Sequence, residues 1–444
     1  MMSVFLSFLW VALGILLLLI FNLKYKMHNI LALLLVALIV GLLEGMDIGK
    51  IASTIEAGVG STMGSLALIV ALGAIIGKLM TESGASQRIA STIIDKFGIK
   101  YLQWALVLIG IIFGMAMFYE VAFLIAAPLV ISIAKEAKIP YMKLIIPTVT
   151  GATMGHSLFP PQPGPMALVS AFNVDVGQVY IFGAIVIIPS VICAGIILPK
   201  LLKGLDKMPL ADILKAPKKF TEEEMPRFGT SLLVPLIPAI IMVIASIVKF
   251  FTSENSTPYK LVSFFGSAEV SMTIALLVGM YFFGIKRGMN GHTIQTHMSK
   301  AISEVANVIL VIAAGGAFKQ VIIDSGVGNN IVKVMEHSSL SPLILAWILT
   351  VIIRLMTGQG AVSAITVAGI MQPMISSFSV SPVLMLLAIA CGSNTITLMY
   401  DGGFLLFQQT LGISMKDTFK TWGLLELVNS VVGLIVCLLL SLVI

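Results

Sequence analysis

The stretch GATMGHSLFPPQPGP, residues 151–165, decides much of the fold. It overlaps the end of an apolar segment, residues 144–158, and four of its last six residues are proline. Prolines at this density cannot continue a helix, because each lacks a backbone N–H and its ring clashes with the preceding turn. Inside a membrane, the freed backbone is tolerated only where it is buried in protein or lines a cavity. If the segment crosses a bilayer, it therefore predicts a helix that breaks within the protein.

The whole chain has the composition of a membrane protein. Of its 444 residues, 58% are hydrophobic and only 11% are charged, whereas soluble domains carry about 25% charged residues. The net charge of +6 does not indicate a nucleic-acid partner, because the basic residues lie in short loops between apolar runs. Such loops are typical of the cytoplasmic side of a membrane. We therefore predict a multi-pass protein of the lipid bilayer that binds no nucleic acid.

About fourteen apolar segments are candidates for crossing a bilayer or re-entering it. They predict an all-α polytopic membrane protein of about 12–14 transmembrane or re-entrant helices. A polar stretch at 203–229 divides the chain into a first repeat at 1–202 and a second at 230–444, and we expect it to be a cytoplasmic linker. The segments are residues 4–21, 30–43, 61–80, 102–118, 121–134, 144–158, 178–201, 231–250, 268–285, 305–323, 340–356, 361–378, 382–399 and 422–443.

The third apolar segment of each half contains a similar stretch. Residues 73–84 are GAIIGKLMTESG and residues 315–326 are GGAFKQVIIDSG, so that Glu82–Gly84 align with Asp324–Gly326. With an odd number of segments per half, the second copy would enter the membrane from the opposite face. The pattern predicts two inverted-topology repeats, an arrangement common in secondary transporters. The alternative is a chance match, since Gly and Ser are frequent in membrane helices.

Each of these stretches also carries a lysine followed by an acidic residue. Lys78 stands four residues before Glu82, and Lys319 stands five residues before Asp324. The first spacing is that of an ion pair on a helix surface, which we expect to be its role.

Four pairs of glycines have the GxxxG spacing that lets helices approach closely in lipid. We expect them to pack helices together rather than to act in function. The pairs are Gly60 with Gly64, Gly73 with Gly77, Gly110 with Gly114, and Gly151 with Gly155.

Ionisable residues inside apolar segments are costly in lipid, so each is a candidate for function. Glu120, in MFYEVAFL, could bind and release a proton, because an apolar environment favours the uncharged carboxyl group; otherwise it lies at the membrane surface. His156 could exchange protons in the physiological range or donate to a substrate, and its alternative role is structural. Gln162 lies within the proline-rich break that follows.

The second half offers two comparable breaks. The first, TGQGAVS at residues 357–363, contains Gly358, Gln359 and Ser363. It follows Arg354, the only arginine inside an apolar run. Arg354 could bind a substrate carboxylate with two parallel hydrogen bonds. Alternatively, it could pair with an acidic side chain of the protein, either Asp401 or Glu120, as a static brace.

The other break is GSNTITLMYDGG, residues 392–403, with Asp401 near its end. Ser393, Asn394 and Thr395 supply hydroxyl and amide groups suited to a polyhydroxylated ligand. Exposed helix N-termini at such breaks attract a carboxylate. The breaks of the two halves therefore predict one shared pocket for an organic anion.

Several other function classes are disfavoured. The five histidines are scattered and no Cys/His spacing fits a metal site, so we expect no metal or other cofactor. No GxxxxGK[ST] stretch indicates direct use of ATP, and an ion gradient must then supply the energy. An enzyme would need a nucleophile–base pair or a metal site, which the sequence does not show. A channel would not need paired breaks.

Several stretches resemble the gluconate permease family, the gluconate:H+ symporters of the ion transporter superfamily. The resemblance covers essentially the whole chain. It is strongest in SLALIVALGAIIGKLMTESGASQRIA (65–90), FYEV (118–121), HSLFPPQPGP (156–165), FTEEEMP (220–226), GGAFKQVIIDSGV (315–327) and SPLILAWILTVIIR (341–354).

The resemblance implies proton-coupled import of gluconate or a related sugar acid across a bacterial inner membrane. Glu120, His156 and Asp401 are then the candidates for proton coupling, and the polar residues of the breaks, with Arg354, are the candidates for binding substrate. The resemblance to the superfamily also implies inverted repeats with re-entrant hairpins, and two copies could form a homodimer.

The chain departs from the family pattern in the breaks assigned to the ligand. Gln162 stands where the family often has the histidine of PPHPGP. Residues 358–363, GQGAVS, stand where it often has GSATVAA, and residues 400–405, YDGGFL, stand where it often has NDPGFW or NDSGFW. The substrate could therefore also be another aldonate or a small hydroxy or amino carboxylate such as D-serine, and the coupling ion could be sodium.

Overall fold

The computed structural model describes residues 9–208, 220–327, 340–397 and 401–444, except residues 11, 15, 19, 22–23, 254 and 379. Within these ranges every regular element is a helix. Seven helices are long and apolar enough to cross a membrane, judged by length and composition, and five shorter helices are also apolar. The predicted all-α polytopic architecture is thus confirmed. Residues 209–219 of the predicted linker lie outside the described ranges.

The helices of the first half are followed by a similar series in the second. The first series is α2 (Asn29–Leu43), α3 (Ile48–Glu82), α4 (Ala85–Phe97), α5 (Leu102–Ala116), α6 (Tyr119–Ala137), α7 (Met142–Leu158), α8 (Pro163–Phe172), α9 (Val176–Val191) and α10 (Leu198–Leu201). The second is α11 (Phe228–Phe251), α12 (Thr257–Phe265), α13 (Ala268–Gly279), α14 (Gly291–Asp324), α16 (Pro342–Thr357), α17 (Gly360–Ser377), α18 (Pro382–Ser393), α19 (Gly402–Leu411), α20 (Met415–Thr418) and α21 (Leu424–Leu440).

The two halves share an order of elements around these helices. Each has a long helix (α3, α14), then two helices joined by a short break (α5 and α6, α16 and α17), then a helix interrupted before a short one (α7 and α8, α18 and α19). The long helices also end alike, because Gly84 and Gly326 both adopt the left-handed conformation, at φ of 76° and 77°. This shared order is what a repeat requires, and the inverted orientation of the two copies stays a prediction.

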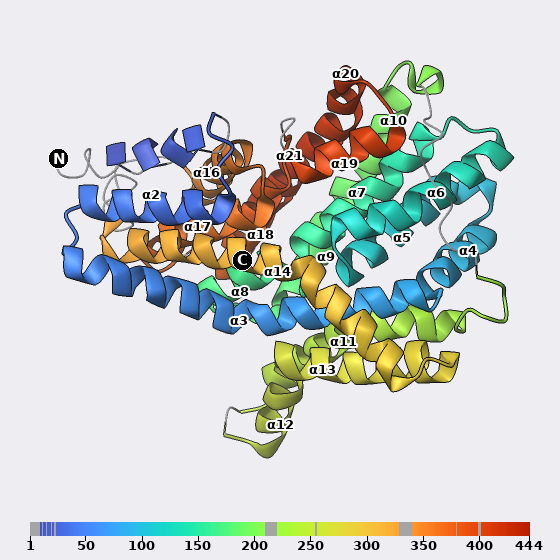
Figure 1. Ribbon diagram of the computed structural model, residues 1–444, viewed down its shortest axis with the longest axis horizontal. Helices are drawn as coiled ribbons and strands as arrows, with labels where there is room; N and C mark the ends of the chain where they lie inside the picture. The colour runs from blue at the N-terminus through green and yellow to red at the C-terminus, as the bar shows by residue number, and fades with distance from the viewer. Residues whose placement is uncertain are drawn as a thin grey trace.

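The long helices α3 and α14 lie side by side along the longest axis of the molecule (Figure 1). They run antiparallel: the Thr54 hydroxyl near the start of α3 donates to Asp324 at the end of α14, at 3.1 Å. Further along, the Lys78 ammonium lies 2.9 Å from Glu304. Lys78 also lies 3.9 Å from Glu82, as its spacing predicted. The polar ends of this helix pair are therefore tied by charge and hydrogen bonds.

Glycines bring the two long helices into backbone contact. A Cβ atom on Gly58 would lie 2.5 Å from the carbonyl oxygen of Gly316 and 2.9 Å from the Cα of Ala317. Because lipid supplies no hydrophobic drive between helices, close van der Waals packing of this kind holds membrane helices together.

Two of the predicted GxxxG pairs interlock where α5 crosses α7. A Cβ on Gly110 would overlap the carbonyl oxygen of Thr148, and a Cβ on Gly151 would overlap that of Val107. The glycines one turn further along, Gly114 and Gly155, face backbone of the other helix in the same way. The packing role predicted for these two pairs is therefore confirmed.

The same prediction is wrong for Gly60 and Gly64 of α3. Within the described ranges, no atom lies within 4 Å of a Cβ added at either position. The spacing alone did not show which glycines face another helix.

This difference predicts opposite outcomes for two matched substitutions. Gly151→Ala should destabilise the protein by about 1–3 kcal/mol or more, because the new methyl group overlaps backbone that cannot rotate away. Gly60→Ala should leave stability unchanged or raise it by up to about 1 kcal/mol, because alanine favours the helix and nothing opposes its methyl group. Thermal unfolding of both variants in detergent, followed by tryptophan fluorescence, checks this. Equal melting temperatures would contradict it.

Candidate functional site

Four helix interruptions lie in the interior of the fold, two from each half. They fall between α5 and α6, between α7 and α8, between α16 and α17, and between α18 and α19. The last three coincide with the breaks that the prolines and glycines predict. Residues 398–400, in the fourth, lie outside the described ranges.

Gln162 joins the two interruptions of the first half. Its side-chain amide donates to the backbone carbonyls of Met115, at 3.2 Å, and Met117, at 3.3 Å. These carbonyls belong to the end of α5, where no further helical N–H is available to satisfy them. Gln162, predicted to bind substrate, therefore braces the end of α5 in this structure.

Small residues bring the two halves together at the interruptions. A Cβ on Gly164, in the first turn of α8, would lie 3.8 Å from the Cα of Ala361, in the first turn of α17. The Asn394 amide, where α18 ends, donates to the Met154 sulfur of α7 at 3.2 Å. The N-termini of α8 and α17 are therefore neighbours, and a carboxylate between them would lie near two helix N-termini.

A buried ion pair links the third and fourth interruptions. Arg354 Nη2 lies 2.8 Å from Asp401 Oδ2, and the two side chains are only 11% and 4% exposed. Asp401 Oδ1 accepts from the backbone N–H of Phe404 at 2.8 Å and so caps the start of α19. Of the partners proposed for Arg354, the structure thus contains the ion pair with Asp401.

Three further ionisable side chains lie close enough to this ion pair to interact with it electrostatically. Glu120, His156 and Glu426 each interact electrostatically with Arg354. We refer to these three residues together with Arg354 and Asp401 as the ionic cluster. It contains one permanently charged cation and three carboxyl groups, so its net charge depends on how many protons it holds.

The members of the cluster differ in their exposure. Glu120 is exposed, whereas Glu426 is only 1% exposed. The His156 ring packs against Phe118 with 5.8 Å between ring centroids. Its Nδ1 atom is buried and has no hydrogen-bond partner among the described residues. Glu120 therefore lies at the surface of the helix bundle, while Glu426 lies in its interior.

Glu426 was not singled out from the sequence, although its position inside an apolar segment is the feature that identified Glu120. Glu426 is the only acidic or basic residue of the apolar segment 422–443. The rule that singles out Glu120, an ionisable group inside an apolar run, applies to it equally.

The remaining predicted site residues lie at or beside the third and fourth interruptions. Gly358, at φ 68°, ends α16, and Gln359 precedes α17. The hydroxyl groups of Ser363 and Ser393 each donate within their own helix at 2.8 Å, to carbonyls of the preceding turn. The buried hydroxyl of Thr395 has no partner among the described residues. Nothing in these contacts tests a role in substrate binding.

A small space lies beside the first two interruptions in this structure. A space of about 10 Å³ lies beside Phe118, Gln162 and Pro163, which is about the minimum that holds one water molecule. No group of three or more His, Cys, Asp or Glu residues that could hold a metal ion occurs in the described part of the chain. A substrate the size of a sugar acid does not fit in this space as it stands.

The fold is similar to two solved transporter structures. The YdaH transporter of Alcanivorax borkumensis superposes with a TM-score of 0.69 at 15% identity, covering 94% of this chain and 98% of that one. MtrF of Neisseria gonorrhoeae superposes with a TM-score of 0.68 at 16% identity, covering 89% and 84%. At these identities the likeness shows the fold alone.

Sequence relatives are closer. Residues 6–443 match the family model of the GntP family permease. A high-affinity gluconate transporter of Escherichia coli (strain K12) is 51% identical over 99% of both chains. A gluconate permease of Bacillus subtilis (strain 168) is 39% identical over 98% of this chain and 99% of that one. The Gnt-II system L-idonate transporter of Escherichia coli (strain K12) is 38% identical over 96% and 97%.

The family match covers nearly the whole chain, the helices are those of a multi-pass membrane protein, and the relatives are named as transporters or permeases rather than enzymes. This chain therefore belongs to the GntP permease family of membrane transporters.

Proposed function

We propose that this protein imports gluconate or a related sugar acid together with protons across a bacterial inner membrane. The substrate class is supported by relatives named as transporters of gluconate and of L-idonate, both sugar acids. The bacterial sources of these relatives support the inner membrane. Proton coupling is supported by one observation above all, the ionic cluster at the helix interruptions, because ionisable groups within membrane helices are typical of ion and substrate pathways.

The geometry suggests how proton and substrate uptake are coupled. Arg354 holds Asp401 at 2.8 Å, and a substrate carboxylate would compete with Asp401 for the same guanidinium. A proton on Asp401 removes its negative charge and frees Arg354 to bind the substrate. Proton and anion would then bind together, and the loaded centre carries no additional net charge.

The same centre offers hydrogen bonds for the hydroxyl groups of a sugar acid. His156, Gln162 and Asn394 supply imidazole and amide groups around the first, second and fourth interruptions. Gln359, Ser363, Ser393 and Thr395 lie around the third and fourth. The N-terminus of α17, which begins beyond Gly358 and Gln359, favours a negatively charged group nearby. We propose these residues as the substrate site when the helices open.

A second candidate is a symporter for another small hydroxy or amino carboxylate, such as a different aldonate or D-serine, coupled to sodium. It is favoured by Gln162 and residues 358–363, where the sequence departs from the pattern of the gluconate permeases. The homodimer, the two inverted-topology repeats and their division at 203–229 also stay predictions.

The proposed coupling is tested by uptake of labelled gluconate into proteoliposomes. With the outside acidic by one pH unit, a symporter that carries one proton per gluconate should accumulate it about tenfold, because that gradient is equivalent to about 1.36 kcal/mol. Protein-free liposomes control for leakage. Uptake driven by a sodium gradient and not by the pH gradient would contradict proton coupling, and an absence of gluconate uptake would contradict the substrate.

Neutralising the cluster should abolish driven transport. Asp401→Asn and His156→Ala should each lower gluconate uptake driven by the pH gradient about tenfold or more. The first removes the carboxyl group whose protonation would couple the proton to substrate binding at Arg354, and the second removes an imidazole that interacts electrostatically with Arg354. Asp175→Asn is the matched control, since Asp175 also caps a helix and pairs with a cation, Lys249 at 3.6 Å, but is 30% exposed. Wild-type rates in the two cluster variants, with normal membrane insertion, would refute the assignment.

Proton release can be separated from substrate movement. Glu120→Gln and Glu426→Gln should each reduce accumulation driven by the pH gradient while leaving exchange of internal for external gluconate, because exchange needs no net proton transfer. Glu269→Gln, at an exposed glutamate, controls for the substitution itself. If both cluster variants accumulate gluconate like the wild type, these carboxyl groups carry no coupling proton.

A further inference from the structure

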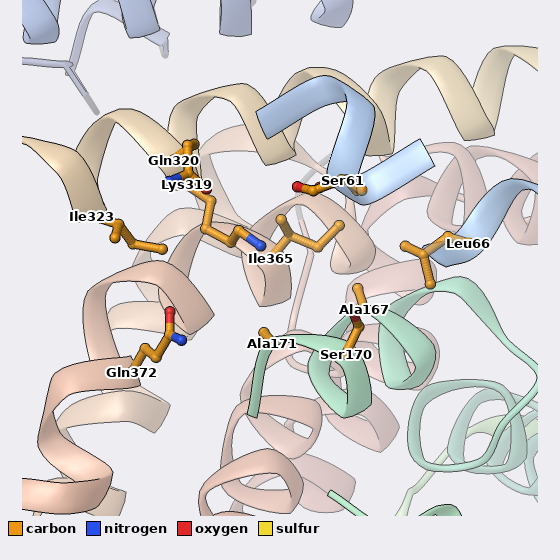
Figure 2. Close-up of a pocket in the computed structure, with 11 residues that line it drawn as sticks. Ser61, Leu66, Ala167, Ser170, Ala171, Lys319, Gln320, Ile323, Ile365 and Gln372 are labelled. Atoms are coloured by element: carbon orange, nitrogen blue, oxygen red, sulfur yellow. The ribbon is translucent and has the colours of Figure 1, made fainter. Parts of the chain in front are cut away.

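A cavity of about 320 Å³ lies between α3, α8, α14 and α17 (Figure 2). By comparison, the space beside Gln162 at the interruptions is about 10 Å³. The cavity is therefore large enough for a sugar acid as the structure stands. Its polar side chains include those of Ser61, Ser170, Lys319, Gln320 and Gln372.

Lys319 supplies the positive charge of this cavity. Figure 2 shows its side chain extending from α14 into the space beside Ile365 of α17. Gly369 of α17 makes this course possible, because a Cβ there would overlap Lys319 Cγ and would lie 3.1 Å from the Lys319 carbonyl oxygen. Helix α17 therefore passes directly over the stem of the lysine, which limits where its ammonium group can go.

No acidic side chain among the described residues pairs with Lys319. The carboxylate of Asp324, further along α14, accepts instead from Thr54 at 3.1 Å and from Gln320 at 2.8 Å. The lysine of the similar stretch in the first half, Lys78, by contrast has Glu304 at 2.9 Å. A partly buried ammonium group without a counter-charge favours an anionic ligand, because pairing offsets the cost of removing the charge from water.

We propose that this cavity is a second, anion-binding subsite for the transported sugar acid, with Lys319 receiving its carboxylate. The identity of the anion rests on the proposed function. Gln320 and Gln372 can each donate and accept hydrogen bonds, as a chain of hydroxyl groups requires. The volume, the single cation and the surrounding amide and hydroxyl groups match a small polyhydroxylated acid.

The subsite has a place on the transport path. Helices α8 and α17 both begin at the interruptions, and both also line the cavity, with Ser170 about two turns beyond Pro163. An anion held by Lys319 therefore lies along the same two helices whose N-termini are neighbours at the interruptions. We place this subsite one step before or after the central site, where it would concentrate the anion before the helices open.

Substitution of the lysine tests the electrostatic role. Lys319→Met keeps the length of the side chain and removes its charge, so the KM for gluconate uptake should rise about tenfold to a hundredfold. Lys319→Arg should retain most of the affinity. Lys300→Met, at an exposed lysine of the same helix, should behave like the wild type. An unchanged KM in well-folded Lys319→Met would overturn the subsite.

A second measurement decides the matter even if Lys319→Met does not fold. In the Ser170→Cys variant, gluconate should protect the introduced thiol from a charged thiol reagent, whereas equal concentrations of neutral glucose should not. The wild type, which retains Cys193, Cys391 and Cys437, gives the background labelling. Labelling that gluconate does not slow would overturn the subsite.

The two proposals fail in different ways. Wild-type vesicles that take up no gluconate under any gradient would overturn the proposed function. Normal wild-type uptake, together with an unprotected thiol in Ser170→Cys, would overturn the subsite and leave the proposed function standing.

Discussion

The guanidinium of Arg354 and the carboxylate of Asp401 lie 2.8 Å apart and are almost removed from solvent. Neither charge could remain alone at that depth, since removing one partner of a buried pair typically costs about 3–5 kcal/mol. Because Asp401 also caps α19, the same contact joins the last turn of α16 to the start of α19. The arrangement of the interrupted helices α16 and α19 in the second half therefore depends on this ion pair. Protonation of Asp401 would remove its negative charge and weaken the ion pair with Arg354.

Close packing elsewhere allows this centre to exist. The glycines that interlock α5 with α7, such as Gly110 and Gly151, let two backbones touch, and Gly58 does the same for α3 with α14. These contacts form a rigid frame in lipid, where side-chain burial drives little association. Against that frame, backbone broken by proline and glycine can be satisfied by side chains such as Gln162. Close helix packing and side-chain hydrogen bonds to freed backbone carbonyls together allow interrupted helices to lie inside the protein.

Much of the fold could be predicted from the sequence, because lipid imposes simple rules. Apolar length indicated the helices, and clustered prolines and glycines located three of the four interruptions. The partner of Arg354 could not be chosen between Asp401 and Glu120, since spacing along a chain does not give distances between segments. Glu426 carried the same signal as Glu120 and was overlooked.

Lys319 shows a different limit of the sequence. In the repeated stretch it lies one position away from the alignment with Lys78, and the two lysines have different surroundings in the fold. Lys78 has acidic neighbours on both long helices, whereas the acid nearest in sequence to Lys319 is engaged by Thr54 and Gln320. The course of the Lys319 side chain along the cavity depends on the lack of a side chain at Gly369, which lies on another helix.

The central claim is that interruptions from both halves of the chain meet inside the membrane. The most direct test is a disulfide cross-link between Gly164→Cys and Ala361→Cys, in a background lacking Cys193, Cys391 and Cys437. A Cβ at the first position would lie 3.8 Å from the Cα of the second, which suits a disulfide. The account predicts rapid cross-linking by a mild oxidant in native membranes. A protein that stays reduced while it is folded and active would contradict it.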